Sequence, residues 1–523
     1  MKIFGLIFAL LSILIGIDGL KILAFLPFGS KSHFAIGHSI AKTLADAGHQ
    51  VTAVSPYPVK KPIENYKDIS TEDYLKVFFK ENAANMFKYE NSGAIAKIIE
   101  VFVIHWMGTE IVEFHVKHPK ILELLNSNEK FDVCLVEVFN FDAVSLGVAE
   151  HFGCEIVSYM TYAAVKWADD MTGNLSPTSY VPKPYLEYTD KMNFKQRLSN
   201  TVYTHIEDLI YEFIIKSNQR KLYNKYFPNA KSTFDEVYKK SAIYFLNTHV
   251  AYSTVRPYLP NLVEIGGIHV QQAKPLPKDI QEYLDSATEG AIVFSMGSLI
   301  KSSEWPVEKR EAFVRSFGKL KQKIIWKYEA ADLPNKPDNV MISPWVPQRD
   351  IMAHPNVKLF ITHGGLLGTT EALIEGIPVL GLPIFGDQKM NMAKAVSREY
   401  GQQIYFNDIT EENLDHALNE LINNPKYYEN AKIISKRFND RPMTPQESVV
   451  YWTEYAHRHK GAQHLKAASL ELNFFEFRSI DVYAVLLLIA LVNFYIDYLV
   501  LKWILRKIFG KSKKVENKKQ KKQ

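Results

Sequence analysis

Residues 345–388 read WVPQRDIMAHPNVKLFITHGGLLGTTEALIEGIPVLGLPIFGDQ and contain a complete strand–turn–helix–strand pattern. Residues 358–362 form a short apolar run typical of a buried parallel strand, His363-Gly364-Gly365 predicts a turn, and helical spacing begins at Thr369. A second apolar strand is expected at 378–383. Because the carboxyl ends of parallel strands open on one crevice, the side chains that follow both strands should meet there.

The residue types of this unit suit a nucleotide-sugar. Unpaired N–H groups and the positive end of the dipole at a helix start attract a diphosphate, and glycines let the backbone approach it. His363 can add a hydrogen-bond donor, and Trp345 offers a flat face for a base. Glu371, Asp387 and Gln388 supply the carboxylates and amide that bind sugar hydroxyls. A Gly-Gly turn alone would be a weak signal, so the prediction rests on the complete string.

This string resembles the signature of the UDP-glycosyltransferase family, and the chain is most similar in character to the membrane-bound invertebrate glucosyltransferases. The likeness extends from Ser32-His33-Phe34 to residues 451–455. The family resemblance implies the GT-B fold, an α/β architecture in which two Rossmann-like domains face a cleft, and a UDP-sugar as donor. We assign donor binding to Ser298, Trp345, Gln348, His363, Gly364, Gly365, Thr369, Glu371, Asp387 and Gln388.

The rest of the chain divides around two α/β patterns. Strand–helix–strand spacing at 21–54 opens the first, and apolar strands at 291–295, 323–327 and 340–342 open the second. The boundaries we expect are a signal peptide at 1–19, an acceptor domain at 20–256, a linker at 257–284, a donor domain at 285–447, a helical return segment at 448–480, a transmembrane helix at 481–501 and a basic tail at 502–523.

Both ends of the chain carry membrane-targeting patterns. Met1-Lys2 followed by the apolar run 3–17 fits a secretory signal, with a buried first strand as the alternative. Residues 482–501 would span about 30 Å as a helix, one hydrocarbon thickness. Polar Asn493 and Asp497 leave a buried amphipathic helix as the competing interpretation.

The basic balance of the protein belongs to its tail. Residues 502–523 carry ten Lys or Arg and one Glu, a net charge of +9, so the remainder of this +5 chain has a net charge of −4. The positive-inside rule then makes the tail cytoplasmic and the preceding chain lumenal. Lys519 and Lys521 resemble a dilysine retrieval signal, which predicts a single-pass type I protein of the endoplasmic reticulum. A membrane span directly before the tail disfavours nucleic-acid binding.

The lumenal prediction brings two smaller expectations. Cys134 and Cys154 are too few for a disulfide framework, so we expect both to be small core residues. Asn174-Leu175-Ser176 is the single N-glycosylation sequon, weakened by Pro177, and a glycoprotein is therefore an open expectation.

Catalysis is expected to centre on His33, which lies between the first strand and the first helix. The motif around it resembles the catalytic histidine of the family, and a neutral imidazole can accept a proton from an acceptor hydroxyl. Glu137 ends an apolar strand and is the first candidate to orient the imidazole, although the family most often has Asp there. Asp142 is the second candidate, and capping of the next helix is the other role open to Glu137.

The sequence predicts no metal and no cofactor, because no Asp-x-Asp pair occurs. Displacement at an α-linked donor, most simply UDP-glucose, would then give a β-glycoside of a small lipophilic acceptor. Four aromatic residues of the first half and one methionine suit that acceptor: Tyr159, Met160, Tyr162, Trp167 and Tyr180. The alternatives are a GT-B UDP-sugar epimerase and a non-enzymatic membrane ligand-binding protein. A dehydrogenase is disfavoured because no Gly-x-Gly-x-x-Gly follows the first strand. The sequence is also compatible with a homo-oligomer.

Overall fold

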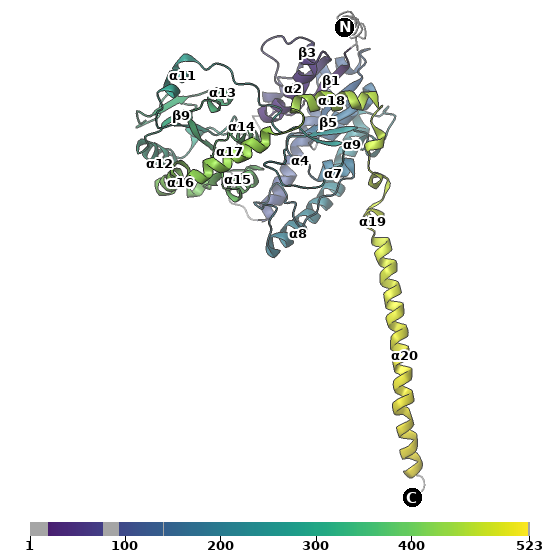
Figure 1. Ribbon diagram of the computed structural model, residues 1–523. Helices are drawn as coiled ribbons and strands as arrows, with labels where there is room; N and C mark the ends of the chain where they lie inside the picture. Colours follow the sequence, from purple (N-terminus) through teal and green to yellow (C-terminus); the bar gives the residue numbers. More distant parts are fainter. Residues whose placement is uncertain (1–18, 77–93, 140, 521–523) are drawn as a thin grey trace, which may run out of the picture. The chain divides into compact units, whose positions relative to one another are not determined.

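The computed structural model describes residues 19–76, 94–139 and 141–520 (Figure 1). The expected signal peptide, 1–19, lies outside the described residues except for Gly19, so that assignment stays a prediction. The chain forms two compact units, residues 1–466 and 467–523. The larger unit contains two parallel sheets and is described first.

A seven-stranded parallel sheet forms the N-terminal domain, in the order β3-β2-β1-β4-β5-β6-β7. Its strands are β1 Lys21–Phe25, β2 Gln50–Ser55, β3 Tyr66–Ser70, β4 Val133–Glu137, β5 Glu155–Met160, β6 Ile243–Leu246 and β7 Leu262–Glu264. Strand order reverses direction between β1 and β4, which are hydrogen-bonded neighbours. The crevice of a doubly wound sheet opens at such a reversal, beyond the carboxyl ends of the strands.

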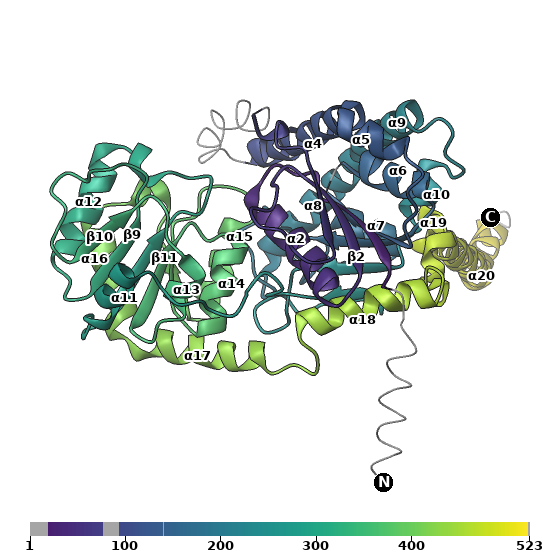
Figure 2. The ribbon, with the colours of Figure 1, turned by 90° about the horizontal axis from the view of Figure 1, so that it is seen from above.

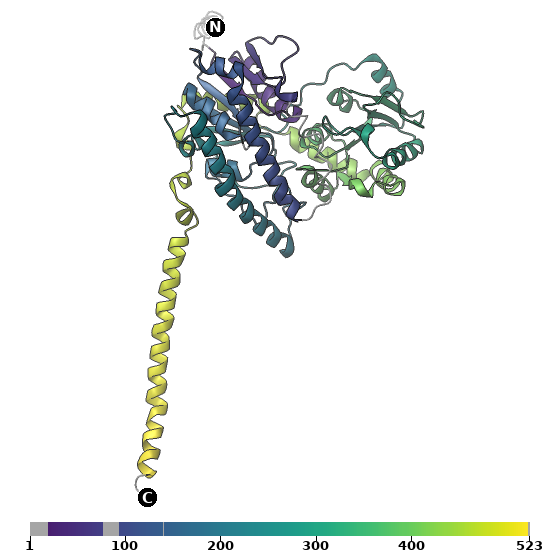
Figure 3. The same ribbon diagram turned by 180° about the vertical axis from the view of Figure 1, so that it is seen from behind.

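Helices cover both faces of this sheet and provide the connections between its strands. They are α2 Lys31–Asp46, α4 Ala94–Lys117, α5 Pro119–Leu125, α6 Asp142–Phe152, α7 Lys166–Thr172, α8 Phe194–Ile210, the π-helical turn Tyr211–Lys216, α9 Ser217–Tyr226 and α10 Phe234–Tyr238. Helix α4 packs against α5, α6 and α9, and Figure 3 shows this helical side of the domain from behind. The central strand β1 is apolar on both faces because helices cover both: Ile22 and Ala24 pack in one core cluster, and Leu23 and Phe25 pack in another.

The C-terminal domain repeats this topology with six parallel strands, in the order β10-β9-β8-β11-β12-β13. The strands are β8 Ala291–Ser295, β9 Lys323–Lys327, β10 Val340–Ser343, β11 Val357–Thr362, β12 Val379–Gly381 and β13 Gly401–Gln403. The helices are α11 Lys278–Asp285, α12 Val307–Gly318, α13 Gln348–Met352, α14 Leu366–Glu375, α15 Gln388–Ser397, α16 Glu411–Asn423 and α17 Pro425–Asn439. Its reversal lies between β8 and β11.

The expected return segment joins the two domains. Helix α17 packs against α14 in the C-terminal domain, and α18 Pro445–Arg458 then packs against α2, β5 and β6 of the N-terminal domain. Val449 and Ala456 of α18 are fully buried there. Figure 2 shows α17 and α18 as consecutive helices, one beside each domain. Burial of α18 therefore fixes the C-terminal end of this unit to the N-terminal domain.

Two expectations about this unit need correction. The predicted linker, 257–284, contains regular structure. The edge strand β7 lies within it, because three residues suffice to extend the sheet beside β6, and α11 starts before it ends. Cys134 and Cys154 form a disulfide instead of remaining separate core thiols, with Cα atoms 5.7 Å apart. Cys134 lies in β4 and Cys154 directly precedes the neighbouring β5, so the strand order brings them together.

The smaller unit is dominated by α20, Ile480–Gln520. Residues 480–509 are long and apolar enough to cross a membrane, and none of the most apolar stretch is buried. This contradicts the alternative of a buried amphipathic helix and makes α20 a candidate membrane anchor that extends beyond the expected 481–501. Lys521 lies outside the described residues, so the retrieval signal stays a prediction.

Candidate active site

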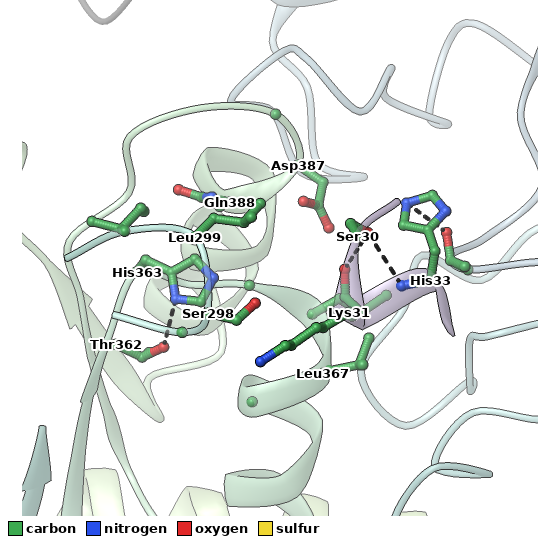
Figure 4. A pocket seen from close by; sticks show the side chains of 18 of the residues that line it. Ser30, Lys31, His33, Ser298, Leu299, Thr362, His363, Leu367, Asp387 and Gln388 are labelled. Carbon is green, nitrogen blue, oxygen red and sulfur yellow. Dashed lines mark hydrogen bonds between the residues drawn. The ribbon is translucent and has the colours of Figure 1, made fainter. Parts of the chain in front are cut away.

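One cavity of about 490 Å³ lies where the two crevices of the larger unit face each other. Turns that follow β1 and β5 line it from the N-terminal domain, and turns that follow β8, β11 and β12 line it from the C-terminal domain. Figure 4 shows His33 and Lys31 on one side of the cavity and Ser298, His363 and Gln388 on the other. The reversals of strand order in both sheets therefore open on the same space.

A histidine–glutamate pair lies on the N-terminal side. Helix α2 begins with Ser30 as its N-cap, whose Oγ accepts a hydrogen bond from the backbone N–H of His33, and this places the imidazole in the first turn. Glu137 is the last residue of β4, the strand beside β1. The Nδ1 atom of His33 is hydrogen-bonded to Oε1 of Glu137. The reversal point thus supplies both members of the pair.

The carboxylate of Glu137 is 1% exposed and has a second partner. The Tyr159 hydroxyl donates to its Oε2 at 3.2 Å, so both carboxylate oxygens are held. On the other edge of the imidazole, Nε2 lies 3.5 Å from Oγ1 of Thr161, a residue that lines the cavity. Phe28 and Phe139 pack around the ring with centroids 4.2 Å and 4.9 Å away. The imidazole is therefore fixed in orientation, with Nε2 on its cavity side.

Asp142, the second candidate partner of His33, lies elsewhere. It is the first residue of α6 and is buried inside the N-terminal domain, where it does not line the cavity. Burial raises the pKa of its carboxyl to about 7. The side chain that contacts His33 is that of Glu137.

The turn after β11 holds His363 between glycines. Gly364 has φ +80°, a left-handed conformation that favours glycine, and Gly365 is the N-cap of α14. A Cβ atom on either Gly297 or Gly365 would collide with the imidazole of His363. Burial, with a smaller contribution from Lys327, lowers the pKa of His363 to about 4. At neutral pH this side chain is an uncharged hydrogen-bonding group beside the start of a helix.

Two polar groups lie near the aromatic platform of the C-terminal side. Nε2 of Gln348 donates to Oε2 of Glu371 at 2.7 Å, and both residues line the cavity together with Trp345. Trp345 is 65% exposed, and the Lys31 ammonium lies 5.3 Å from the centroid of its ring. Burial raises the pKa of Glu371, partly offset by the Gln348 hydrogen bond. This arrangement offers a stacking surface and an oriented carboxylate.

Asp387 and Gln388 lie at the start of α15. Asn391 Nδ2 donates to Oδ2 of Asp387 at 2.8 Å, while Oε1 of Gln388 accepts the backbone N–H groups of Ile384 and Phe385 at 2.9 Å and 3.2 Å. The amide NH2 of Gln388 is therefore the end that remains to donate to a ligand. Burial raises the pKa of Asp387.

The sequence of this chain matches a family described as "UDP-glucoronosyl and UDP-glucosyl transferase" over residues 25–515. The chain belongs to this family. It is 37% identical over 503 residues to UDP-glycosyltransferase UGT5 of Dactylopius coccus, with 94% of each chain covered. It is 30% identical to UDP-glucuronosyltransferase 1A7 of Mus musculus, covering 92% of this chain and 91% of the mouse protein. The protein is therefore a UDP-glycosyltransferase. The alternative of a UDP-sugar epimerase is not favoured.

Solved structures place the UDP-glycosyltransferase in the GT-B fold. It superimposes on the glycosyltransferase VinC in complex with dTDP with a TM-score of 0.58, at 15% identity, covering 84% of this chain and all of that one. The calicheamicin glycosyltransferase CalG4 gives a TM-score of 0.57 at 14% identity, covering 84% of this chain and 99% of that one. The predicted fold class is confirmed.

Several predicted site residues of the transferase have other surroundings. Thr369 does not line the cavity, because its hydroxyl donates within α14 to the Gly365 carbonyl at 2.9 Å. Gly364 also lies behind the lining, where its carbonyl accepts from Asn391. Among the residues expected to form the acceptor pocket, Tyr162 lines the cavity, while Tyr159, Met160, Trp167 and Tyr180 do not. Tyr159 instead holds Glu137.

Other lining residues were not predicted. They include Phe28, Lys31, Met107, Phe139, Thr161, Pro184, Tyr185, the turn 295–297 with Leu299, and Phe385. Lys31 had a detectable signal, because it lies two residues before His33. The aromatic group comes from four separate segments and had none. Asn391 also had a signal, since it lies one helical turn after Asp387.

Two further expectations concerned N-glycosylation at Asn174 and the absence of a metal site. Asn174 is 6% exposed, and its amide donates to Asp169, Leu175 and Pro257, so a glycan does not fit on this side chain. Within the described ranges, no three His, Cys, Asp or Glu side chains come together in a group that could hold a metal ion.

Proposed function

We propose that this UDP-glycosyltransferase transfers glucose from UDP-glucose to a hydroxyl group of a small lipophilic acceptor, with inversion to a β-glycoside and with His33 as general base. The observation that carries the proposal is the His33–Glu137 pair, which faces the donor-type turn around His363 across a single cavity. A general base must lie in the same space as both substrates.

The His33–Glu137 contact supports one tautomer of the imidazole for the proposed mechanism. Glu137 holds Nδ1 of His33 as the N–H donor, so Nε2 is the basic nitrogen and lies on the cavity side beside Thr161. Nε2 takes the acceptor proton while the acceptor oxygen bonds to the anomeric carbon. The bond from that carbon to the phosphate oxygen breaks, and UDP leaves with the electron pair. Glu137 stabilises the imidazolium that results.

A neutral hexose suits the charges of the cavity better than a uronic acid. Asp387 is the carboxylate at the expected sugar end, and Lys31 is the single Lys or Arg among the described residues that line the cavity. The Lys31 ammonium lies over Trp345, at the expected base end. Lys394 lines a second, smaller cavity beside Asp387. The carboxylate of a glucuronosyl donor would therefore meet Asp387 without a lining cation at hand.

Aromatic side chains around His33 favour a lipophilic acceptor. Phe28, Phe139, Tyr162 and Tyr185 line the N-terminal part of the cavity beside Met107. Such rings bury apolar ligand surface and place the reacting hydroxyl near Nε2 of His33.

The catalytic unit is proposed to lie in the lumen of the endoplasmic reticulum, anchored by α20 with its basic tail in the cytoplasm. The Cys134–Cys154 disulfide supports an oxidising compartment, and the charge of residues 502–523 supports the orientation. Lys519→Ser with Lys521→Ser should keep the protein in membranes and let it leave the endoplasmic reticulum. Localisation by microscopy in cells checks this, and an unchanged distribution would remove the retrieval role.

The central test is an acceptor screen on microsomes that contain the protein, with UDP-glucose, UDP-glucuronic acid, UDP-galactose and UDP-N-acetylglucosamine as donors. We expect UDP-glucose to give the highest kcat/KM, β-linked products by NMR, and no loss of rate with EDTA. A preference for UDP-glucuronic acid would refute the donor assignment. Retention of the α-configuration would refute direct displacement.

A further inference from the structure

Lys31 is a cationic residue of one domain whose side chain reaches the other domain. It is the first residue of α2, two residues before His33, and belongs to the N-terminal domain. Its Nζ lies 5.3 Å from the centroid of the Trp345 ring, which belongs to the C-terminal domain. Figure 4 shows the side chain extended away from His33 toward Ser298 and Leu367. The ammonium group therefore bridges the cleft next to the donor-type turn.

Among the described residues that line the cavity, one cationic side chain could pair with a diphosphate. Of the described residues that line the cavity, Lys31 is the single Lys or Arg, whereas Glu371 and Asp387 are acidic. His363 adds a neutral ring, since burial lowers its pKa to about 4. The N–H groups at the start of α14 contribute partial positive charge only. A nucleoside diphosphate gains negative charge as it leaves, so a full positive charge nearby stabilises both the bound donor and the departing group.

We propose that Lys31 is a donor-binding residue whose ammonium pairs with the diphosphate when a nucleobase takes its place over Trp345. The inference rests on the proposed use of a nucleoside-diphosphate sugar and adds an N-terminal-domain residue to a donor site built from the C-terminal domain. One ring face cannot hold both a base and an ammonium group. Stacking of the base thus displaces Lys31, and the diphosphate attached to that base provides its new partner.

The position of Lys31 links donor binding to the catalytic base. Lys31 and His33 share the first turn of α2, which the Ser30 side chain caps. An ion pair between Lys31 and the diphosphate therefore holds that turn against the C-terminal domain while His33 keeps its bond to Glu137. Donor binding would close the cleft at the point where the acceptor hydroxyl must meet the anomeric carbon.

The test compares ligands that differ only in phosphate. Titration calorimetry on the detergent-solubilised full chain would measure binding of UDP, UMP and uridine to the unmodified protein, Lys31→Met and Lys31→Arg. Loss of a charge-assisted contact should weaken UDP binding by about tenfold to a hundredfold in Lys31→Met. Uridine should bind equally well or better, because Trp345 is no longer covered. Lys31→Arg should stay within about threefold for UDP.

Lys301→Met provides the matched control. Lys301 is exposed, pairs with Glu304 and lies outside the cavity, so its loss changes the net charge by the same amount without touching the ligand. UDP affinity should be retained there and thermal melting unchanged in all variants. Equal weakening of UDP and uridine in Lys31→Met, or unchanged UDP binding, would overturn the role of Lys31. Failure of the unmodified protein to bind UDP would instead overturn the donor site itself.

Discussion

The N-terminal and C-terminal sheets share one topology, and each has a histidine near the start of the helix that follows a strand at its reversal point, yet the two histidines have different surroundings. His33 contacts a buried carboxylate, Glu137, and its other nitrogen lies on the cavity side. His363 is enclosed by Gly297 and Gly365, has no carboxylate partner among the described residues that line the cavity, and has a pKa lowered to about 4. Corresponding regions of the two domains therefore hold one histidine paired with a carboxylate, which we propose as the proton acceptor, and one neutral hydrogen-bonding histidine. The surroundings of the imidazole decide its role.

The largest effect is expected from breaking the N-terminal pair. Glu137→Gln should lower kcat by roughly 10² or more, because His33 loses its orientation and the stabilisation of its imidazolium. The KM for the UDP-sugar should change little, since the donor side is untouched. Steady-state kinetics beside His33→Ala, with melting curves to confirm folding, measures this. Near-normal turnover in Glu137→Gln would show that the pair is not catalytic.

The C-terminal side should respond in donor affinity. Asp387→Ala removes a carboxylate that Asn391 holds toward the cavity, and loss of a hydrogen bond to a sugar hydroxyl costs on the order of 1 to 3 kcal/mol. Donor use should weaken more than tenfold. Kinetics with varied UDP-sugar measure the change, and Asp415→Ala on the exposed face of α16 is the control. An unchanged KM and kcat would contradict the donor assignment.

Asp142 sharpens the comparison, because it is the carboxylate that the structure separates from His33. Its folded-state pKa is raised from 3.8 to about 7, so the folded protein holds more protons than the unfolded chain between these values, and stability falls as pH rises through that window. Asp142→Asn should therefore raise the melting temperature more at pH 8 than at pH 4. Turnover should change far less than in Glu137→Gln. A melting temperature that falls more at pH 8 than at pH 4 would refute the pKa shift.

The smallest effect on chemistry is expected from removal of the apolar helix α20. A chain ending at Ser479 keeps the complete cavity and the buried helix α18, and it lacks the apolar helix α20. It should be soluble and secreted, with kcat within about threefold of the full chain, because no lining residue is lost. Carbonate washing of membranes and kinetics on the soluble protein check this. A truncated chain that still pellets with membranes would refute a single anchor.

Much of the strand, turn and helix around His363 was predictable, because the sequence pattern that indicates them lies in neighbouring residues. The run from 358 to 362, the Gly-Gly turn and the following helix lie within one short stretch, and the structure builds the expected strand and turn from them. Helix α14 begins at Leu366, three residues earlier than predicted, because Gly365 serves as its N-cap. Short edge strands such as β7 and β13 escaped prediction because three residues carry too little periodicity.

The amino-acid sequence by itself determined the family, the paired α/β architecture, the candidate anchor and most residues of the donor turn, because each depends on residues close together in the chain. Tertiary structure decided the rest. Strand order brought the end of β4, with Glu137, against His33 and joined Cys134 to Cys154, while Asp142 became the buried first residue of α6. It also turned Tyr159 from an expected acceptor contact into the support of Glu137. The physical reason is that hydrogen bonds and burial depend on which strands become neighbours, and local spacing does not encode that order.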